Sequence, residues 1–426
     1  TPVRTDASVD VSTVIGSGSG ADVITEMRAG GLDEIVVVRV GTGGTAATVT
    51  LQDTTADTAV DVVGLTALYP GNRAFAITIK DSLEDESLKQ AILYEDTKIL
   101  ESVTFEAGEN EVDGLVNALA NSAYVKAEKK AAGNGTLADV AQKKFTAGTN
   151  PTVNSAAYSA GFSASEAESW NMICVDTNDT AIHALLQAFI GRIYEDGAYP
   201  MCVIAEPQTV DLDDRIAHGA AFNDEKIHYV LNSWVGSDGT IYEGYLAAAR
   251  IAGMIAASAA NESLTHTVIS GATTLNEALT NAQIKKALKS GCIVLSLSKS
   301  RQVWIEKAIN TLVTLAANQD AGWKKIRRVK TRYELMNRIE ATVEPMIGTV
   351  DNDADGRAAI IAAAQRVVDA MAGEKKLIPG GTVTEDANNP ATGDSAWFIV
   401  AVDDLDSIET IYLTFRFRFA ADTETE

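Results

Sequence analysis

The sequence is poor in cysteine, with only three in 426 residues: Cys174, Cys202 and Cys292. They are odd in number and far apart, and no C-x-x-C pair occurs. Neither a disulfide framework nor a zinc or thiol redox pair is therefore indicated. Because each cysteine lies in an apolar stretch, we expect three buried free thiols in a protein made in a reducing cytoplasm.

Basic residues are also few relative to acidic ones. Lys and Arg number 35 against 58 Asp and Glu, so the net charge is −23. Such a charge repels phosphate and anionic headgroups, and we expect neither nucleic acid nor a membrane as a partner. No run of about 20 apolar residues and no signal peptide is present. The chain starts at Thr1 without Met, so we expect an N-terminal segment to be missing.

A catalytic or metal-binding constellation is the third absence. No G-x-S-x-G elbow occurs, and the four histidines, His183, His218, His228 and His266, lack metal-ligand spacing. The glycine-rich run at residues 16–20 has neither the G-x-G-x-x-G spacing nor the lysine of a phosphate-binding loop. We predict that the protein is not an enzyme and has no cofactor or metal.

One acidic run leaves two interpretations open. Residues 351–356 read D-N-D-A-D-G, the first half of an EF-hand loop, but Ala362 occupies the twelfth position, where a bidentate Glu is required. The run also opens a helix, whose N-terminus favours carboxylates. We expect helix capping here, with calcium binding as the alternative.

Strands and helices alternate between residues 148 and 300. We expect strands at 171–175, 201–205 and 226–231, and helices at 180–195, 212–221 and 242–259. Such alternation predicts a parallel sheet covered by helices. An apolar strand at 34–40 would fit the same sheet, which makes the Thr-, Val- and Asp-rich residues 46–147 a β-rich insertion.

The last part of the chain is of a different type. Apolar spacing predicts two amphipathic helices, at 323–343 and from Gly356 to Gly373, followed by strands at 396–402 and 411–419. The predicted fold class is multidomain, with an α/β sheet domain that carries a β-rich insertion and an α+β C-terminal domain. The predicted divisions are 1–45 (joining the α/β domain), 46–147 (outer insertion), 148–300 (α/β), 301–408 (C-terminal domain) and 409–426 (C-terminal arm).

A group of cations is unexpected in so acidic a protein. Six of them crowd the start of the helix predicted at 323–343: Lys324, Lys325, Arg327, Arg328, Lys330 and Arg332. Each cation near a helix N-terminus costs about 0.3–1 kcal/mol, and like charges three or four residues apart add to that cost. A solvated face is the alternative, but we predict a dedicated acidic partner, either a neighbouring subunit or another protein.

The end of the chain has the strict period of two that is typical of a β-strand with one buried face. Polar or mixed side chains (Tyr412, Thr414, Arg416, Arg418) alternate with apolar ones. We expect the apolar set to contact another subunit: Ile411, Leu413, Phe415, Phe417 and Phe419. A final strand needs no return connection and is easily donated to a neighbouring chain, so it suggests an assembling protein.

Several motifs resemble those of the tail sheath proteins of contractile phage tails and phage-tail-like particles. Tyr-Pro-Gly-Asn-Arg at 69–73 is similar to the family's Y-P-G-x-R-G-N turn, although Ala74 and Phe75 depart from its end. The other similar segments, in the order of the family, are 261–265 (N-x-S-L-T), 280–294 (T-N-x-x-I followed by A-L-x-x-G), 309–312 (I-N-T-L), 353–357 (D-G-R) and the terminal strand.

The resemblance implies a structural role. Sheath subunits stack around an inner tube, add N- and C-terminal arm strands to the sheets of adjacent subunits, and contract to drive the tube through a target envelope. It implies these partners: further copies of the chain, the inner tail tube protein, and baseplate and tail terminator proteins. The C-terminal domain, with the six cations, would face the tube. The particle would be a virion tail or tail-like particle assembled in the host cytoplasm.

Two other classes remain as alternatives. An α/β nucleotide- or ligand-binding enzyme would need a glycine loop or a clustered acid–base set. A secreted calcium-binding surface protein would need a signal peptide and complete carboxylate ligand sets.

Overall fold

The computed structural model describes residues 2–9, 11, 15, 16 and 18–417, in two compact units. The first unit comprises residues 1–21 and 34–169, and the second comprises residues 22–33 and 170–426. Each unit has its own β-sheets and its own hydrophobic core.

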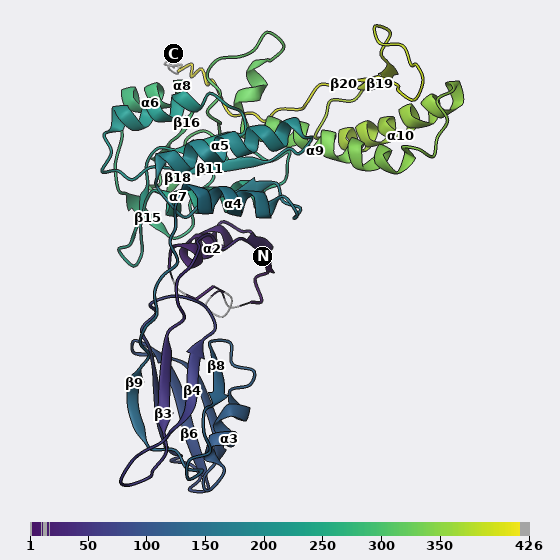
Figure 1. Cartoon of the computed structure of the whole chain (residues 1–426). Coiled ribbons are helices and arrows are strands. Elements are labelled where there is room, and N and C mark those ends of the chain that lie inside the picture. Colours follow the sequence, from purple (N-terminus) through teal and green to yellow (C-terminus); the bar gives the residue numbers. More distant parts are fainter. Residues whose placement is uncertain (1, 10, 12–14, 17, 418–426) are drawn as a thin grey trace, which may run out of the picture. The chain divides into compact units, whose positions relative to one another are not determined.

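The first unit contains a β-sandwich (Figure 1). Its strands are β3 (Thr48–Gln52), β4 (Asp61–Ala67), β5 (Phe75–Asp81), β6 (Leu88–Glu95), β7 (Lys98–Glu106), β8 (Val125–Lys129) and β9 (Val140–Lys144). One sheet has the order β3-β4-β8 and the other β7-β6-β5-β9, with antiparallel neighbours throughout. Inward-facing side chains such as Leu51, Leu65, Ile77 and Leu93 form one shared core. The β-rich character predicted for this region is confirmed.

The remaining elements of the first unit correct one prediction. They are β1 (Val3–Thr5), β2 (Ile35–Val37), α3 (Glu111–Ala118) and α4 (Ser155–Ser165). The strand expected at 34–40 does not join the parallel sheet, because β2 pairs antiparallel with β1 instead. It is also short, and Val36 and Val37 are only partly buried, unlike residues of a central strand.

The parallel sheet of the second unit has the order β10-β11-β12-β16. Its strands are β10 (Met172–Ile173), β11 (Met201–Ala205), β12 (Ile227–Val230) and β16 (Cys292–Ile293). All residues of β11 and β12 are buried, because helices such as α5 and α7 cover the sheet on its two sides (Figure 1). The predicted parallel sheet is therefore confirmed.

The helices around this sheet are α2 (Ser19–Ala29, shared between the units), α5 (Thr180–Glu195), α6 (Leu212–Phe222), α7 (Tyr245–Ala257) and α8 (Asn281–Lys289). Three of them, α5, α6 and α8, begin where a short polar side chain caps the first turn. Asp179 caps α5 by accepting from the Ala181 amide. Thr280 and Gln283 form a capping box at the start of α8.

The second unit also contains two small antiparallel sheets. One has the order β14-β13-β15 and the other pairs β17 with β18. Their strands are β13 (Trp234–Gly236), β14 (Ile241–Tyr242), β15 (Ala272–Leu275), β17 (Leu295–Leu297) and β18 (Val303–Ile305).

The C-terminal part of the second unit packs two helices on a two-stranded sheet. It contains the 3-10 turns η1 (Ala321–Lys324) and η2 (Glu344–Met346), helices α9 (Ile326–Val343) and α10 (Ala354–Gly373), and strands β19 (Thr382–Glu385) and β20 (Phe398–Ala401). Leu335, Val368, Met371 and Val383 belong to the core between them. β19 was not predicted, and the predicted strand 396–402 is β20.

The acidic run before α10 is a helix cap, as predicted. Asp353 accepts from the Gly356 amide at 2.8 Å. A side chain at Gly356 would lie 1.9 Å from the Asp351 carbonyl oxygen, so this turn requires glycine. Within the described part of the chain, no group of three or more His, Cys, Asp or Glu residues could hold a metal ion. No helix among these residues is long and apolar enough to cross a membrane.

Candidate subunit interface

The end of the described chain carries a row of exposed apolar side chains. The exposed fractions are 72% for Ile411, 93% for Tyr412, 72% for Leu413, 73% for Phe415 and 90% for Phe417. Residues 406–417 form no strand, because no other described segment pairs with them. Arg418 and Phe419, which belong to the predicted strand, lie outside the described residues. Within the described chain, the alternating side chains of this segment are therefore not part of any β-sheet.

The six predicted cations lie where η1 leads into α9, and they bind groups of the same chain. Arg328 donates through Nε and Nη2 to the two carboxylate oxygens of Asp404, each at 2.5 Å. Arg332 lies 3.1 Å from the same carboxylate and 2.9 Å from that of Asp320. Lys325 lies 2.6 Å from Asp406.

Glu409 is the last residue that this cluster holds. Its carboxylate lies 3.2 Å from the Lys325 ammonium and accepts from the Ser263 hydroxyl at 2.7 Å. Thr265 donates to the same oxygen at 3.3 Å. Only 6% of the Glu409 side chain is exposed, whereas Ile411 is 72% exposed, so the chain leaves the surface between these two residues.

The other three cations bind main-chain oxygens. Arg327, whose side chain is 5% exposed, donates to the carbonyl oxygens of Asn261 and Leu405. Lys330 donates to the carbonyl oxygens of Ile255 and Ser258, at the C-terminal end of α7, where a cation complements the helix dipole. Lys324 donates to the carbonyl oxygen of Val313.

The acidic partners keep their negative charge despite partial burial. Burial acts to raise the pKa of Asp404, but the hydrogen bond from Arg328 and the charge of Arg332 outweigh it, so the pKa lies below its usual value. Burial likewise acts to raise the pKa of Asp406, but the hydrogen bonds from Lys325 and the Ser407 amide lower it below its usual value. These carboxylates also lie beside the N-terminal turns of α9, where anions offset the helix dipole.

The sequence shows the cations but not their partners. Asp404, Asp406 and Glu409 lie at least 72 residues from the cations that they pair with, so helical periodicity could not connect them. One signal was available: an acidic run that includes Asp403 immediately precedes the apolar segment and opposes the cations in sign. The predicted contact of the six cations with a partner outside the chain stays a prediction.

The sheet β19–β20 offers a second exposed apolar surface. Trp397 is 42% and Ile399 is 44% exposed. Thr384 pairs with Ile399 and Thr382 with Ala401, and Val383 faces the core. In the described chain, each of these two strands has a partner on one side only. Both therefore have a free edge.

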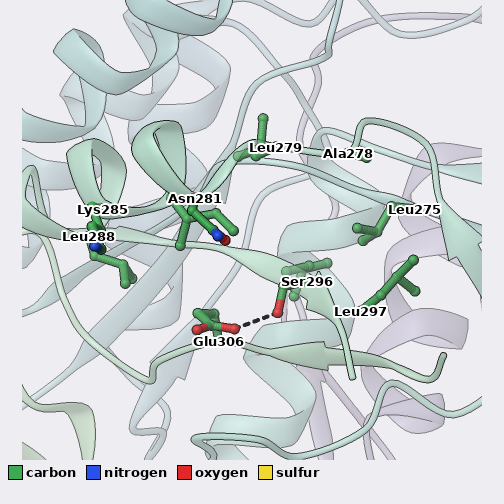
Figure 2. Close-up of a pocket in the computed structure, with 11 residues that line it drawn as sticks. Leu275, Ala278, Leu279, Asn281, Lys285, Leu288, Ser296, Leu297 and Glu306 are labelled. Carbon is green, nitrogen blue, oxygen red and sulfur yellow. Dashed lines mark hydrogen bonds between the residues drawn. The ribbon is translucent and has the colours of Figure 1, made fainter. Parts of the chain in front are cut away.

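An open groove of about 580 Å³ lies between α8 and β17 (Figure 2). Leucines 275, 279, 288 and 297 line it, with Lys285 and Glu306 as its charged residues. Ser296 donates to the Glu306 carboxylate at 2.5 Å, so one of the carboxylate oxygens is already hydrogen-bonded (Figure 2). Ser296 also accepts from the Trp304 indole at 2.7 Å. This lining does not form the nucleophile, base and oxyanion arrangement of an active site.

The chain matches sequence models of two domains of one family. The phage tail sheath protein beta-sandwich domain matches residues 42–150, and the phage tail sheath protein central domain matches residues 152–311. An uncharacterised Bacillus subtilis (strain 168) protein, YqbK, is 24% identical over 216 residues, which are 50% of this chain and 44% of that protein. The chain thus spans less than half the length of this relative.

Solved structures share the fold. The sheath tail protein of Desulfitobacterium hafniense matches with a TM-score of 0.74 at 21% identity, over 95% of this chain and 93% of that one. The sheath tail protein Lin1278 of Listeria innocua matches with a TM-score of 0.64 at 20% identity, over 95% and 92% of the two chains. A chain of the anti-feeding prophage baseplate matches with a TM-score of 0.52 at 11% identity, over 65% and 77%.

Proposed function

The chain belongs to the phage tail sheath protein family and is a tail sheath subunit, and we propose that its copies polymerise around an inner tube and contract to drive that tube through a target envelope. The single observation that carries the assembly part of this proposal is the exposed apolar segment at residues 411–417. The contraction part rests on the family.

The exposed segment suits strand donation. Large apolar side chains in a continuous row are unfavourable in water and mark a surface that another chain covers. Their alternation with Thr414 and Arg416 would place Leu413, Phe415 and Phe417 on one face of a strand. Main-chain hydrogen bonds to a sheet edge would then supply affinity, and the aromatic side chains would supply register.

The sheet β19–β20 is our candidate for the acceptor. A two-stranded sheet is only marginally stable by itself, and an added strand would satisfy the free main-chain groups along one edge. Trp397 and Ile399, which are 42% and 44% exposed, would contact the aromatic face of the incoming strand. Because such a strand is joined to its own subunit by a short extended segment, subunits could reorient while staying connected.

Contraction in this account requires no nucleotide. The extended sheath would be metastable, and new subunit contacts in the contracted state would supply the free energy. The family is structural, and we propose that the protein has no ATPase activity. Robust ATP hydrolysis by the purified protein would contradict this part.

The domain placement and the other partners follow from the same family. The C-terminal domain at 301–408 would face the inner tube protein, the β-rich domain at 46–147 would lie outside, and the sheath ends would contact baseplate and tail terminator proteins. An acidic tube surface would add to, or compete with, the pairs that Lys325, Arg328 and Arg332 already make with Asp404 and its neighbours. The particle would be a virion tail or tail-like particle assembled in the host cytoplasm.

Electron microscopy of the purified chain, concentrated with and without the tube protein of the same particle, tests the proposal. We expect rings or striated tubes, because the arm and its acceptor are carried by every copy. Uniform single particles under all these conditions would contradict polymerisation. Tubes that form but never shorten on heating or in mild denaturant would contradict contraction alone.

A further inference from the structure

The ion pairs between α9 and residues 404–409 form one connected structure, which we call the arm-root clamp. Its members are the cations Lys325, Arg327, Arg328 and Arg332 and the acidic residues Asp404, Asp406 and Glu409. We propose that the arm-root clamp fixes residues 404–409 to their own subunit, so that residues 410–417 are the part of the described chain that is free to reach another copy. The inference rests on the proposed function only in treating that chain as an arm.

The first argument is how completely the root of the arm is held. Main-chain bonds join the Ile378 amide to the Asp403 oxygen at 2.8 Å and the Leu405 amide to the Lys376 oxygen at 3.0 Å. Arg327 donates to the Leu405 oxygen. The ion pairs of Asp404, Asp406 and Glu409 then continue the attachment at three positions up to Glu409, while the Ile408 side chain between them is exposed.

The second argument is that these pairs are shielded from solvent. The exposed side-chain fractions are 5% for Arg327, 7% for Asp404 and 6% for Glu409. Charges buried to this degree are expensive unless they are paired, and removing one partner leaves the other uncompensated. The lowered pKa of Asp404 and Asp406 agrees with carboxylates that stay ionised in these pairs.

The third argument is the loss of polar contacts beyond Glu409. Within the described chain, residues 410–417 make no hydrogen bond or ion pair to the rest of the subunit, and although Ile408 is already 85% exposed, Ile411, Leu413, Phe415 and Phe417 are all at least 72% exposed. The pivot of the arm is therefore at Thr410. Phe417 is the eighth residue after Glu409, and a fully extended chain of that length spans about 26–29 Å. If residues 411–417 pair with a sheet edge of a neighbouring copy, the near end of that edge must lie within this distance of Glu409 of the donating copy.

Hydrogen exchange of the unassembled full-length chain tests the arm-root clamp directly. In the wild type, we expect a peptide covering 402–410 to be protected and one covering 411–417 to exchange freely. The variant K325Q/R328Q/R332Q should speed exchange of 402–410 by at least about tenfold, since each charged hydrogen bond contributes roughly that factor to the closed state.

The chain provides a control with the same change in charge. Lys285, Lys286 and Lys289 lie exposed on α8, and K285Q/K286Q/K289Q should leave exchange at 402–410 unchanged. If the clamp variant does not fold, Glu409→Gln is the milder test. It removes one charge from the clamp, next to the pivot, and should speed exchange of 402–410 measurably.

Unchanged exchange at 402–410 in both clamp variants, or a wild-type peptide 402–410 as unprotected as 411–417, would overturn the arm-root clamp. Neither result would bear on polymerisation by the wild type. Conversely, a wild type that never polymerises would contradict the proposed function while leaving the exchange result for the clamp intact.

Discussion

A side chain on Gly253 of α7 would lie 2.1 Å from the carbonyl oxygen of Met27 in α2, so the two helices approach each other there as closely as backbones allow. The buried pair Arg250–Glu26, with its charged atoms 2.7 Å apart, lies beside this crossing. Glycine and the ion pair together fix how α2 packs on the helices of the parallel sheet.

Enlarging Gly253 should therefore separate α2 from α7. We expect Gly253→Val to lower the free energy of unfolding by about 1–3 kcal/mol or more, as overpacked cores do. Chemical denaturation of the unassembled protein measures this. Gly191, in α5, has open space around it, and Gly191→Ala should be neutral or stabilising by up to about 1 kcal/mol. Equal effects of the two substitutions would contradict the close approach.

Lys330 should make stability depend on pH in the alkaline range. Burial lowers its pKa from 10.5 to about 8, so folding is penalised while the amine is charged. Above pH 8 the folded state binds fewer protons than the unfolded state, and stability rises with pH until about 10.5. The wild type should gain up to about 3 kcal/mol relative to Lys330→Met over that range.

Denaturation curves of the wild type and Lys330→Met at pH 7.5 and 9.5 provide the comparison. Only the difference between the two proteins is diagnostic, because other groups titrate in both. A difference that stays constant with pH, or moves in favour of the variant, would show that the lysine is not desolvated. His228 is fully buried nearby, and burial together with the charge of Lys330 lowers its pKa to about 3, so it should not titrate in this range.

In the β-sandwich, Lys89 holds a buried carboxylate. Its ammonium lies 2.7 Å from the Leu137 carbonyl oxygen, 2.9 Å from Asp139 and 3.5 Å from Glu111, whose side chain is 5% exposed. Lys89→Met should destabilise the first unit by about 3–5 kcal/mol, because the Glu111 charge loses its counterion.

An exposed pair in the same unit is the control for Lys89. Lys126 and Glu128 are 68% and 66% exposed, and Lys126→Met should cost less than about 1 kcal/mol. Hydrogen exchange resolved by peptide would assign each loss to the sandwich strands. Similar costs for both substitutions would mean that burial of the Lys89 pair is unimportant.

The three thiols should be inert in the native protein. Burial raises the pKa of Cys174 and of Cys292 to about 12 and holds that of Cys202 well above its usual value. Because the thiolate is the reactive form, a thiol reagent at pH 8 should modify none of them within minutes and all three in guanidinium chloride. Rapid labelling of any cysteine in the native chain would contradict this.

Local sequence signals predicted the elements whose causes are local. The buried run Met201–Ala205 forms β11 with the predicted bounds, and Asp179 and Asp353 cap α5 and α10 because each cap depends on residues within three positions. The parallel sheet followed from the alternation of such elements.

Relations between distant segments were not predictable in this way. The strand Ile35–Val37 reads as a core strand, yet it pairs with β1, because pairing is decided by what lies beside it in space. Asp404, which pairs with both Arg328 and Arg332, lies more than 70 residues downstream of them, and nothing in the acidic and basic runs indicates which of their residues pair. Likewise, the described part of the predicted strand, residues 411–417, has no partner among the described residues, and its pairing with another copy stays a prediction.

The most direct test of the account is sedimentation and electron microscopy of the arm variant Phe415→Ser/Phe417→Ser. The control is Leu83→Ser, because Leu83, on the loop after β5, is also apolar and is 90% exposed. The account predicts that the arm variant, and likewise a chain truncated before Ile411, folds like the wild type but forms no rings or tubes, whereas Leu83→Ser assembles normally. Tubes formed by the truncated chain would contradict it.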